Sequence, residues 1–186
     1  MIYTKKDLEK FLIALDKEVE SKHKIVVIGG AAATLHYNSK QGTIDIDTYN
    51  SIANLKTAYE RTIKKFPDLK IPLSAAVPAQ GPVNLNDRLE KYSNSLIKNL
   101  EILIPEAHDW VLLKTSRCEE KDLADIKELS EVRNIDPSIL QERFANEMLP
   151  QNPGNDELLI SAYLYMISVV FGEQIATQHQ KSLKSN

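Results

Sequence analysis

The sequence contains very little cysteine and glycine. Cys118 is the only cysteine in 186 residues, so the chain can form neither an internal disulfide nor a cluster of thiolate metal ligands. We therefore expect a reducing, cytoplasmic setting. The six glycines make up about 3% of the chain, where roughly 7% is usual, and this scarcity favours helices over a β architecture rich in turns.

Basic charge and long apolar runs are scarce as well. The 23 lysines and arginines are outnumbered by 26 aspartates and glutamates, which leaves a formal net charge of −3. Without an overall positive field, we do not expect a dedicated non-specific binder of nucleic acid, although this composition leaves room for a local basic patch. No apolar run follows the N-terminal charges, and the apolar stretch near the C-terminus is interrupted by Ser161, Tyr163 and Ser168. We expect neither a signal peptide nor a membrane span.

Apolar periodicity and turn residues predict short strands among helices. The helix expected over residues 4–21 has Thr4 as its N-cap and apolar residues at helical spacing after it. The expected strands are residues 24–28, 43–49, 69–77 and 100–104. Further helices are expected over residues 31–36, 51–66, 106–117, 121–132, 137–148 and 156–176, whereas residues 78–95 fit neither pattern. This order predicts an α/β or α+β fold, with a small mixed sheet flanked by helices and a helical C-terminal part.

Two glycines and two aspartates form the most informative motif of the sequence. Gly29 and Gly30 directly follow an apolar segment that is typical of a strand buried on both faces, and a short alanine-rich helix is expected after them. Fourteen residues separate Gly30 from Asp45, and Asp47 lies two positions further on. A glycine turn lets the backbone come close to a phosphate, and the amides and dipole at the start of a helix favour an anion.

The segment around the two aspartates is predicted to be a strand with two different faces. Because side chains alternate along a strand, Asp45 and Asp47 share one face, with Cα atoms roughly 6–7 Å apart, while Ile44 and Ile46 share the other. Neighbouring carboxylates repel each other unless a cation lies between them, and Mg²⁺ (or Mn²⁺) is the expected occupant because it completes its shell with substrate phosphates. Two solvated carboxylates and an ordinary tight turn are the simpler alternatives for each motif alone.

In this order, the motifs resemble those of the polymerase-beta-like nucleotidyltransferase superfamily. Its signature is an apolar strand, Gly-Gly or Gly-Ser, a short helix, and then Asp-x-Asp or Asp-x-Glu. The resemblance implies that Asp45 and Asp47 are catalytic metal ligands and that Gly29 and Gly30 bind the triphosphate of a nucleotide. The reaction it implies moves a nucleoside monophosphate from a nucleoside triphosphate to an acceptor and releases pyrophosphate.

A second group of charged residues lies in the two helices expected between residues 106 and 132. On helical wheels, Lys114 falls within the apolar sector of the first helix, and Asp122 and Asp125 fall within the apolar stripe of the second. Charged groups aimed at a core need a partner, water or a ligand. Either these side chains form a buried ion pair that holds the two helices together, or they line the same cleft as the Asp-x-Asp pair.

This second group narrows the resemblance to a branch of small prokaryotic nucleotidyltransferases related to abortive-infection type toxins. The residues that carry it are Pro-Glu at 105–106, Leu-Leu-Lys at 112–114 and Lys-Asp-Leu-Ala-Asp-Ile at 121–126. The resemblance implies that Lys114 and Asp122 are catalytic and that Lys114 and Asp125 help bind the nucleotide. It spans about residues 23–132, and the chain departs from it by lacking a basic residue just before the Asp-x-Asp and a third carboxylate on a later strand.

Two hypotheses about function follow. The first is a metal-dependent nucleotidyltransferase whose acceptor is RNA, such as tRNA, or a protein, in a toxin-type enzyme with an antitoxin protein as partner. The second, motivated by the missing third carboxylate, is a catalytically degenerate nucleotidyltransferase-like module that only binds. We expect residues 1–134 to form the nucleotidyltransferase-like domain and residues 135–186 a helical extension packed on it. The apolar helix over residues 156–176 is either well buried or a surface for homo-oligomer formation.

Overall fold

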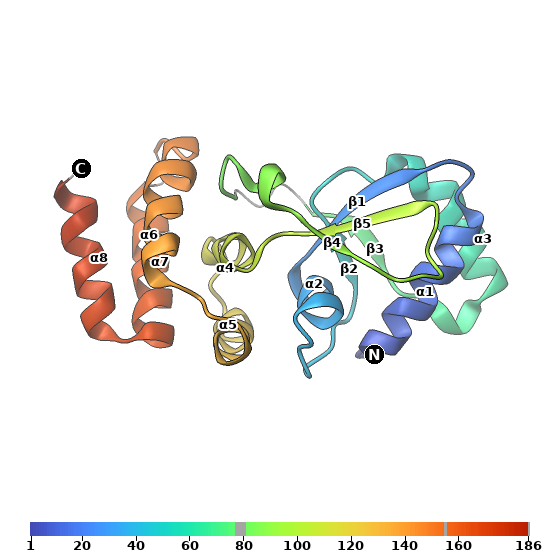
Figure 1. Cartoon of the computed structure of the whole chain (residues 1–186), viewed down its shortest axis with the longest axis horizontal. Helices are drawn as coiled ribbons and strands as arrows, with labels where there is room; N and C mark the ends of the chain where they lie inside the picture. Colours follow the sequence, from blue (N-terminus) through green and yellow to red (C-terminus); the bar gives the residue numbers. More distant parts are fainter. Residues whose placement is uncertain (77–80, 155, 186) are drawn as a thin grey trace. The chain divides into compact units, whose positions relative to one another are not determined.

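The computed structural model describes residues 1–76, 81–154 and 156–185 (Figure 1). The chain divides into two compact units. The first comprises Met1–Pro78 and Leu89–Pro105, and the second comprises Ala79–Arg88 and Glu106–Asn186. Neither unit is one continuous segment, because the chain enters the second unit, returns to the first and then leaves it again. The predicted division into domains 1–134 and 135–186 stays a prediction.

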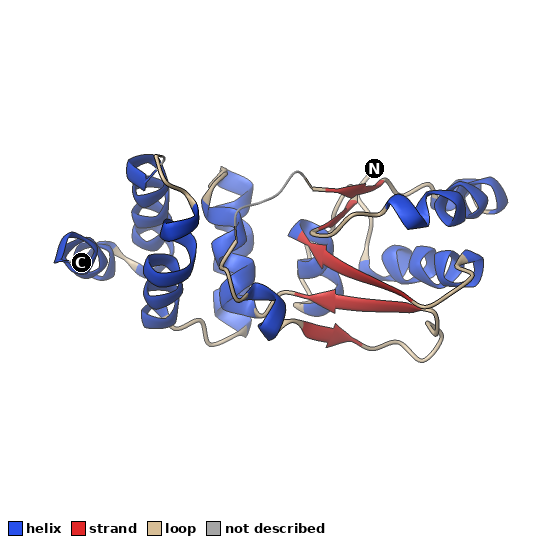
Figure 2. Ribbon diagram, turned by 90° about the horizontal axis from the view of Figure 1, so that it is seen from above, coloured by secondary structure: helices blue, strands red, loops and turns tan. Residues whose placement is uncertain are grey.

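A five-stranded mixed sheet belongs to the first unit, and Figure 2 draws its strands in red. In spatial order the strands are β3 (Leu73–Ala75), β2 (Ile46–Thr48), β1 (His23–Ile28), β5 (Leu100–Ile104) and β4 (Glu90–Tyr92). β1 is parallel to β5 and antiparallel to β2, β2 is parallel to β3, and β4 is antiparallel to β5. The last four residues of β1 are buried, as expected for an apolar strand inside a sheet.

In the described part of the first unit, three α-helices accompany this sheet. They are α1 (Lys5–Glu18), α2 (Gly29–His36) and α3 (Lys56–Lys65), with the short 3-10 helices η1 (Ala53–Leu55) and η2 (Pro67–Leu69) on either side of α3. α1 begins as predicted after Thr4, whose side chain forms a capping box with Asp7. α1 packs beside α3, and α2 packs against β1 and β2. The mixed α/β class predicted from the sequence is confirmed.

The second unit is helical, which confirms the predicted helical C-terminal part. Its α-helices are α4 (Ala107–Thr115), α5 (Glu120–Val132), α6 (Pro137–Arg143), α7 (Asp156–Phe171) and α8 (Glu173–Ser185). Its shorter turns are the 3-10 helices η3 (Leu85–Arg88) and η5 (Leu149–Gln151) and the π-helix η4 (Phe144–Met148). The buried rings of Phe144 and Tyr163 stack with their centroids 3.9 Å apart. No helix in the described part of the chain is both long and apolar enough to cross a membrane.

The strand predicted over residues 43–49 is shorter than expected. Only β2 is a strand there, and Thr43 forms an isolated bridge with Tyr3. Ile46 is fully buried, whereas Ile44 is 55% exposed. Ile44 therefore lies outside the strand face on which it was predicted to lie with Ile46, because regular alternation begins only where β2 pairs with its neighbours.

Two other expected segments also differ from the structure. The helix expected over residues 156–176 is two helices, because Gly172 has a φ of +100° and ends α7. Residues 78–95, which fit no pattern in the sequence, contain η3 and β4. Residues 77–80, which include the end of the strand expected over 69–77, lie outside the described residues.

Candidate functional site

The glycine turn and Asp47 lie next to each other in the first unit. Ile28, the last residue of β1, pairs with Asp47 of β2 in antiparallel register. Gly29 follows with a φ of +61°, in the left-handed region that favours glycine. A Cβ atom on Gly29 would lie 3.8 Å from Asp47 Oδ2. The structure thus brings together the turn and one of the two carboxylates that the sequence singles out.

Gly30 packs against the chain that carries Asp45. A Cβ atom on Gly30 would lie only 2.8 Å from Thr43 Oγ1, which is closer than van der Waals contact allows. The same hydroxyl donates to the backbone carbonyl of Asp45 at 3.1 Å and lies 3.4 Å from Asp45 Oδ1. Gly30 is therefore needed for close packing, and Thr43 links the turn to the second carboxylate.

The start of α2 lies at this turn and has no side-chain cap. Its N-cap residue is Ile28, whose side chain makes no capping hydrogen bond. The first amides of a helix and its dipole attract anions. Because this helix end lies beside Asp47, a phosphate bound there would be close to a negative carboxylate. A cation between the two would offset that repulsion.

Ser74 occupies the position beside Asp47 on the neighbouring strand. It is the register partner of Asp47 in the parallel pair of β2 and β3, and its hydroxyl donates to Asp47 Oδ1 at 2.9 Å. A third carboxylate is therefore missing from this position, where the strand carries a hydroxyl. The described residues contain no group of three or more histidine, cysteine, aspartate or glutamate side chains that could hold a metal ion. Since magnesium is held by one or two carboxylates together with water and phosphates, a magnesium site at Asp45 and Asp47 stays a prediction.

Lys114, Asp122 and Asp125 form a buried ion-pair cluster in the second unit. Lys114 Nζ lies 2.8 Å from Asp122 Oδ1 and 2.6 Å from Asp125 Oδ2. The three residues are at most 6% exposed, which confirms that their side chains point inward. Lys114 Nζ also lies 4.6 Å from the centre of the Trp110 ring, in the geometry of a cation–π contact. The buried ion pair between α4 and α5, one of the two alternatives for these residues, is present.

Asp122 has further partners that hold it in its charged form. Arg117 donates to both of its carboxylate oxygens at 2.7 and 2.6 Å, and the carboxylate accepts from the backbone amide of Glu119 in a capping box at the start of α5. Burial alone would raise the pKa of Asp122, but the hydrogen bonds from Arg117 and Lys114 outweigh it and lower the pKa to about 2. A carboxyl group with so low a pKa is a weak base at neutral pH.

The predicted site residues thus fall into two groups. Gly29, Gly30, Asp45 and Asp47 come together at one end of β1 in the first unit. Lys114, Asp122 and Asp125 come together between α4 and α5 in the second unit. The prediction that both groups line one cleft stays a prediction.

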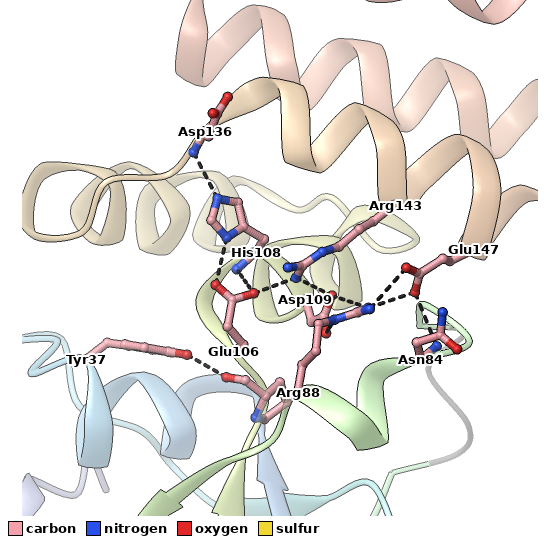
Figure 3. Close-up of polar contacts among 10 residues, drawn as sticks. Tyr37, Asn84, Arg88, Glu106, His108, Asp109, Asp136, Arg143 and Glu147 are labelled. Atoms are coloured by element: carbon pink, nitrogen blue, oxygen red, sulfur yellow. Dashed lines mark hydrogen bonds and ion pairs between the residues drawn. The ribbon is translucent and has the colours of Figure 1, made fainter.

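A second charged network in the second unit was not predicted from the sequence (Figure 3). The fully buried carboxylate of Asp109 accepts hydrogen bonds from Arg88 at 2.8 and 3.0 Å and from Arg143 at 2.9 Å. Arg88 also binds both carboxylate oxygens of Glu147, at 3.1 and 2.7 Å. Asp109 lies on the same apolar helix as Trp110, which is a signal of an inward charge, but its arginine partners are 21 and 34 residues away. No local pattern reveals such partners.

His108 extends this network to the start of α6. The backbone amide of Asp136 donates to His108 Nε2 at 2.9 Å, so the ring proton lies on Nδ1, which donates to Glu106 Oε1 at 2.7 Å. Glu106 also accepts from Arg143. Burial alone would raise the pKa of Glu106, but the hydrogen bonds from His108 and Arg143 lower it to about 2. The network joins η3, α4, α6 and η4, which indicates a structural role.

Comparison with known proteins adds one finding. Neither the curated proteins nor the solved structures gave a match to this chain. A family model described as a nucleotidyltransferase of unknown function (DUF6036) matches residues 6–159, which include the glycine turn, both aspartates and the cluster around Lys114. Because the match covers most of the chain, the protein belongs to this nucleotidyltransferase family.

Proposed function

We propose that the protein is a metal-dependent nucleotidyltransferase that moves a nucleoside monophosphate from a nucleoside triphosphate to an acceptor. The observation that carries the proposal is the contact of the glycine turn with Asp47, since it combines an anion site with a carboxylate that can hold a cation. The family supports a nucleotidyltransferase-like activity in general. Metal dependence, the nucleotide and the acceptor belong to the proposal.

In this proposal, the residues of the first unit bind the triphosphate and the metal ion. The amides at the start of α2 hold the triphosphate, and Asp45 and Asp47 are the ligands of Mg²⁺ or Mn²⁺. When bound, the metal ion offsets the charge of the phosphates and makes the acceptor oxygen more nucleophilic. Ser74 holds the Asp47 carboxylate through its hydrogen bond to Oδ1, which leaves Oδ2 facing Gly29 for a ligand.

In the proposed reaction, the acceptor oxygen forms a bond to the α-phosphorus of the nucleotide. The bond from this phosphorus to the oxygen that bridges to the β-phosphate breaks, and pyrophosphate leaves with that electron pair. The proton of the acceptor passes to a carboxylate of the Asp45–Asp47 pair or to water. Asp122 is a poorer choice for this proton because of its low pKa.

The roles of the second group rest on the resemblance to the toxin-related branch. In the proposal Lys114 and Asp125 contact the nucleotide and Asp122 completes the acidic site. Their mutual ion pairs favour a structural role instead, since the charge of Lys114 is already matched by two carboxylates. The toxin-type role, with RNA such as tRNA or a protein as acceptor and an antitoxin as partner, comes from the same resemblance.

The test is transfer of label from α-labelled nucleoside triphosphates to total cellular RNA or protein, with Mg²⁺ or Mn²⁺. We expect Asp45→Asn with Asp47→Asn to reduce transfer to less than about one hundredth, because both proposed metal ligands are lost. The matched control is Asp68→Asn with Asp87→Asn, which also removes two negative charges, but at exposed carboxylates outside the proposed site. Product formed at an unchanged rate by the first double variant would contradict the proposal.

A non-catalytic binding module is the second candidate. The observation that favours it is Ser74 beside Asp47, in place of a third carboxylate. In that case calorimetry detects binding of a nucleoside triphosphate with Mg²⁺ that depends on Asp47, while no pyrophosphate is released with any of the four common nucleotides. Growth arrest on expression, abolished by Asp47→Asn, favours the toxin-type enzyme instead.

A further inference from the structure

A basic pocket lies at the other end of β1, away from the glycine turn. It has a volume of about 580 Å³ and is lined by the first residues of β1 and β5, by β4 and by the loop between β4 and β5. Four lysines line it, namely Lys22, Lys24, Lys91 and Lys98, against one acidic residue, Glu101. This excess of positive charge is local, because the whole chain has a net charge of −3.

Most of this positive charge has no acidic partner in the pocket. Lys91 Nζ lies 3.7 Å from Glu101, an exposed pair that contributes little to stability. Among the described residues, Lys22, Lys24 and Lys98 form no ion pair. Unpaired lysines that share one hollow repel one another unless an anion is bound there. The pocket therefore has the charge of a site for phosphates.

The wall of the pocket is held rigidly by a buried carboxylate. Asp16, which is 3% exposed, accepts hydrogen bonds from the backbone amides of Lys98, Asn99 and Leu100 at 3.0, 2.6 and 2.6 Å. His23 also lines the pocket. A preformed wall of this kind is typical of a binding site.

We infer that this pocket binds the phosphodiester backbone of a nucleic-acid strand, the acceptor class of the proposed reaction. The pocket lines the start of β1, and the glycine turn follows its end, six residues and about 20 Å further along. A strand several nucleotides long can lie in the pocket while its end reaches the turn. This assignment of the acceptor rests on the proposed function, but binding to the pocket does not require catalysis.

The experiment measures binding of a short, fluorescently labelled single-stranded RNA to the full chain by anisotropy, with EDTA and without nucleotide. The test variant is Lys22→Ala/Lys24→Ala/Lys98→Ala. The matched control is Lys6→Ala/Lys56→Ala/Lys64→Ala, which removes the same charge from exposed positions of α1 and α3. Circular dichroism verifies that both triple variants fold.

We expect the pocket variant to bind the RNA at least tenfold more weakly and to reduce the slope of log affinity against log salt by about 2, since each lost phosphate contact contributes about 0.7. The control variant and Asp45→Asn/Asp47→Asn retain binding, so that failure of the proposed chemistry leaves this result intact. Three outcomes overturn the inference: no RNA binding by the wild-type chain at low salt, equal loss in both triple variants, or displacement of the RNA by micromolar tripolyphosphate, which assigns the pocket to small phosphates.

Discussion

At the scale of single residues, Gly29 has two separate reasons to be glycine. Its φ of +61° is costly for other residues, and a Cβ atom would lie 3.8 Å from Asp47 Oδ2, where the proposed phosphate and metal ion bind. These two reasons act on different quantities. The backbone conformation affects the free energy of unfolding, whereas the occupied space affects binding of the nucleotide.

We predict that Gly29→Ala lowers the free energy of unfolding by about 1–2 kcal/mol through backbone strain. In addition, it weakens binding of a non-hydrolysable nucleoside triphosphate with Mg²⁺ by about tenfold or more, which corresponds to about 1.4 kcal/mol, because the added methyl group occupies the space between the turn and Asp47. Urea unfolding and calorimetry measure the two effects.

Gly154→Ala is the matched control for this prediction. Gly154 has a φ of +95°, so alanine is strained there too, but nothing lies within 4 Å of its added Cβ atom. We expect this variant to lose stability and to keep its nucleotide affinity. If both variants changed the affinity equally, the glycine turn would have no special role in binding.

The two glycines of the turn also show what a sequence motif predicts about a site and what it does not. The sequence marks Gly29 and Gly30 alike as places where backbone approaches a ligand. In the structure only Gly29 faces a predicted site residue, while Gly30 is required by its contact with Thr43, thirteen residues away. Such a contact depends on how the chain returns to the turn, which the motif itself does not describe.

At the scale of elements, α4 and α5 are joined by charges that the helical wheels already placed inside. The wheels locate Lys114, Asp122 and Asp125 because the apolar stripe of a helix is a local property. They do not reveal Arg117, which is 58% exposed at its side chain and still binds both oxygens of Asp122. The cluster therefore contains Arg117 as a second positive group beside Lys114.

We predict that this cluster makes stability depend on pH in the acid range. The folded chain holds the pKa of Asp122 at about 2, below its ordinary value of 3.8, so the unfolded chain binds more protons between these values. The stabilisation is present above about pH 4 and is lost as the pH falls towards 2. With a shift of nearly two units at a fully buried carboxylate, it amounts to about 2 kcal/mol.

The measurement is urea unfolding of wild type and Asp122→Asn between pH 7 and pH 2. We expect the variant to be less stable at pH 7 and the difference to shrink by about 2 kcal/mol as the pH approaches 2. Asp87→Asn, at an exposed carboxylate, is the control and changes little at any pH. A difference that stays constant over the whole range would show that Asp122 is not the titrating group.

Other elements show which local sequence signals are enough to predict the bounds of a helix or strand. α1 and β5 follow the sequence closely, because the capping box of Thr4 and the apolar run of residues 100–104 lie within the elements themselves. β2 and β4 are three residues long and exist through pairing with β1, β3 and β5, so their bounds depend on partners distant in sequence. The split between α7 and α8 depends on one glycine whose φ the apolar periodicity does not indicate.

At the scale of the whole molecule, the chain alternates between its two compact units. Ala79–Arg88 belongs to the helical unit, although the segments on both sides of it in the sequence belong to the sheet unit. Within the helical unit this segment is held by Arg88, which binds Asp109 and Glu147, and by the backbone amide of Asn84, which donates to Glu147. Leu85 of the same segment is buried.

We predict that Arg88→Met releases this segment before the rest of the chain unfolds. Among the described residues, the fully buried Asp109 then keeps only Arg143 as a charged partner, and a broken buried pair of this kind costs about 3–5 kcal/mol. Hydrogen exchange with mass spectrometry measures the effect: the amides of residues 81–88 exchange faster, while those of β1 change less. Asn86→Ala, at an exposed position of the same segment, is the control and leaves both regions unchanged.

The exchange rates of residues 81–88 and of β1, compared with each other, show whether Arg88 stabilises the segment or the whole chain. If residues 81–88 and β1 became faster by the same factor, Arg88 would contribute only to global stability, and the two units would unfold together. If the segment alone responds, a single arginine sets the stability of the segment that leaves the sheet unit and returns to it. The helical unit then depends on a charge network whose members are distant in sequence, which explains why neither composition nor periodicity indicates it.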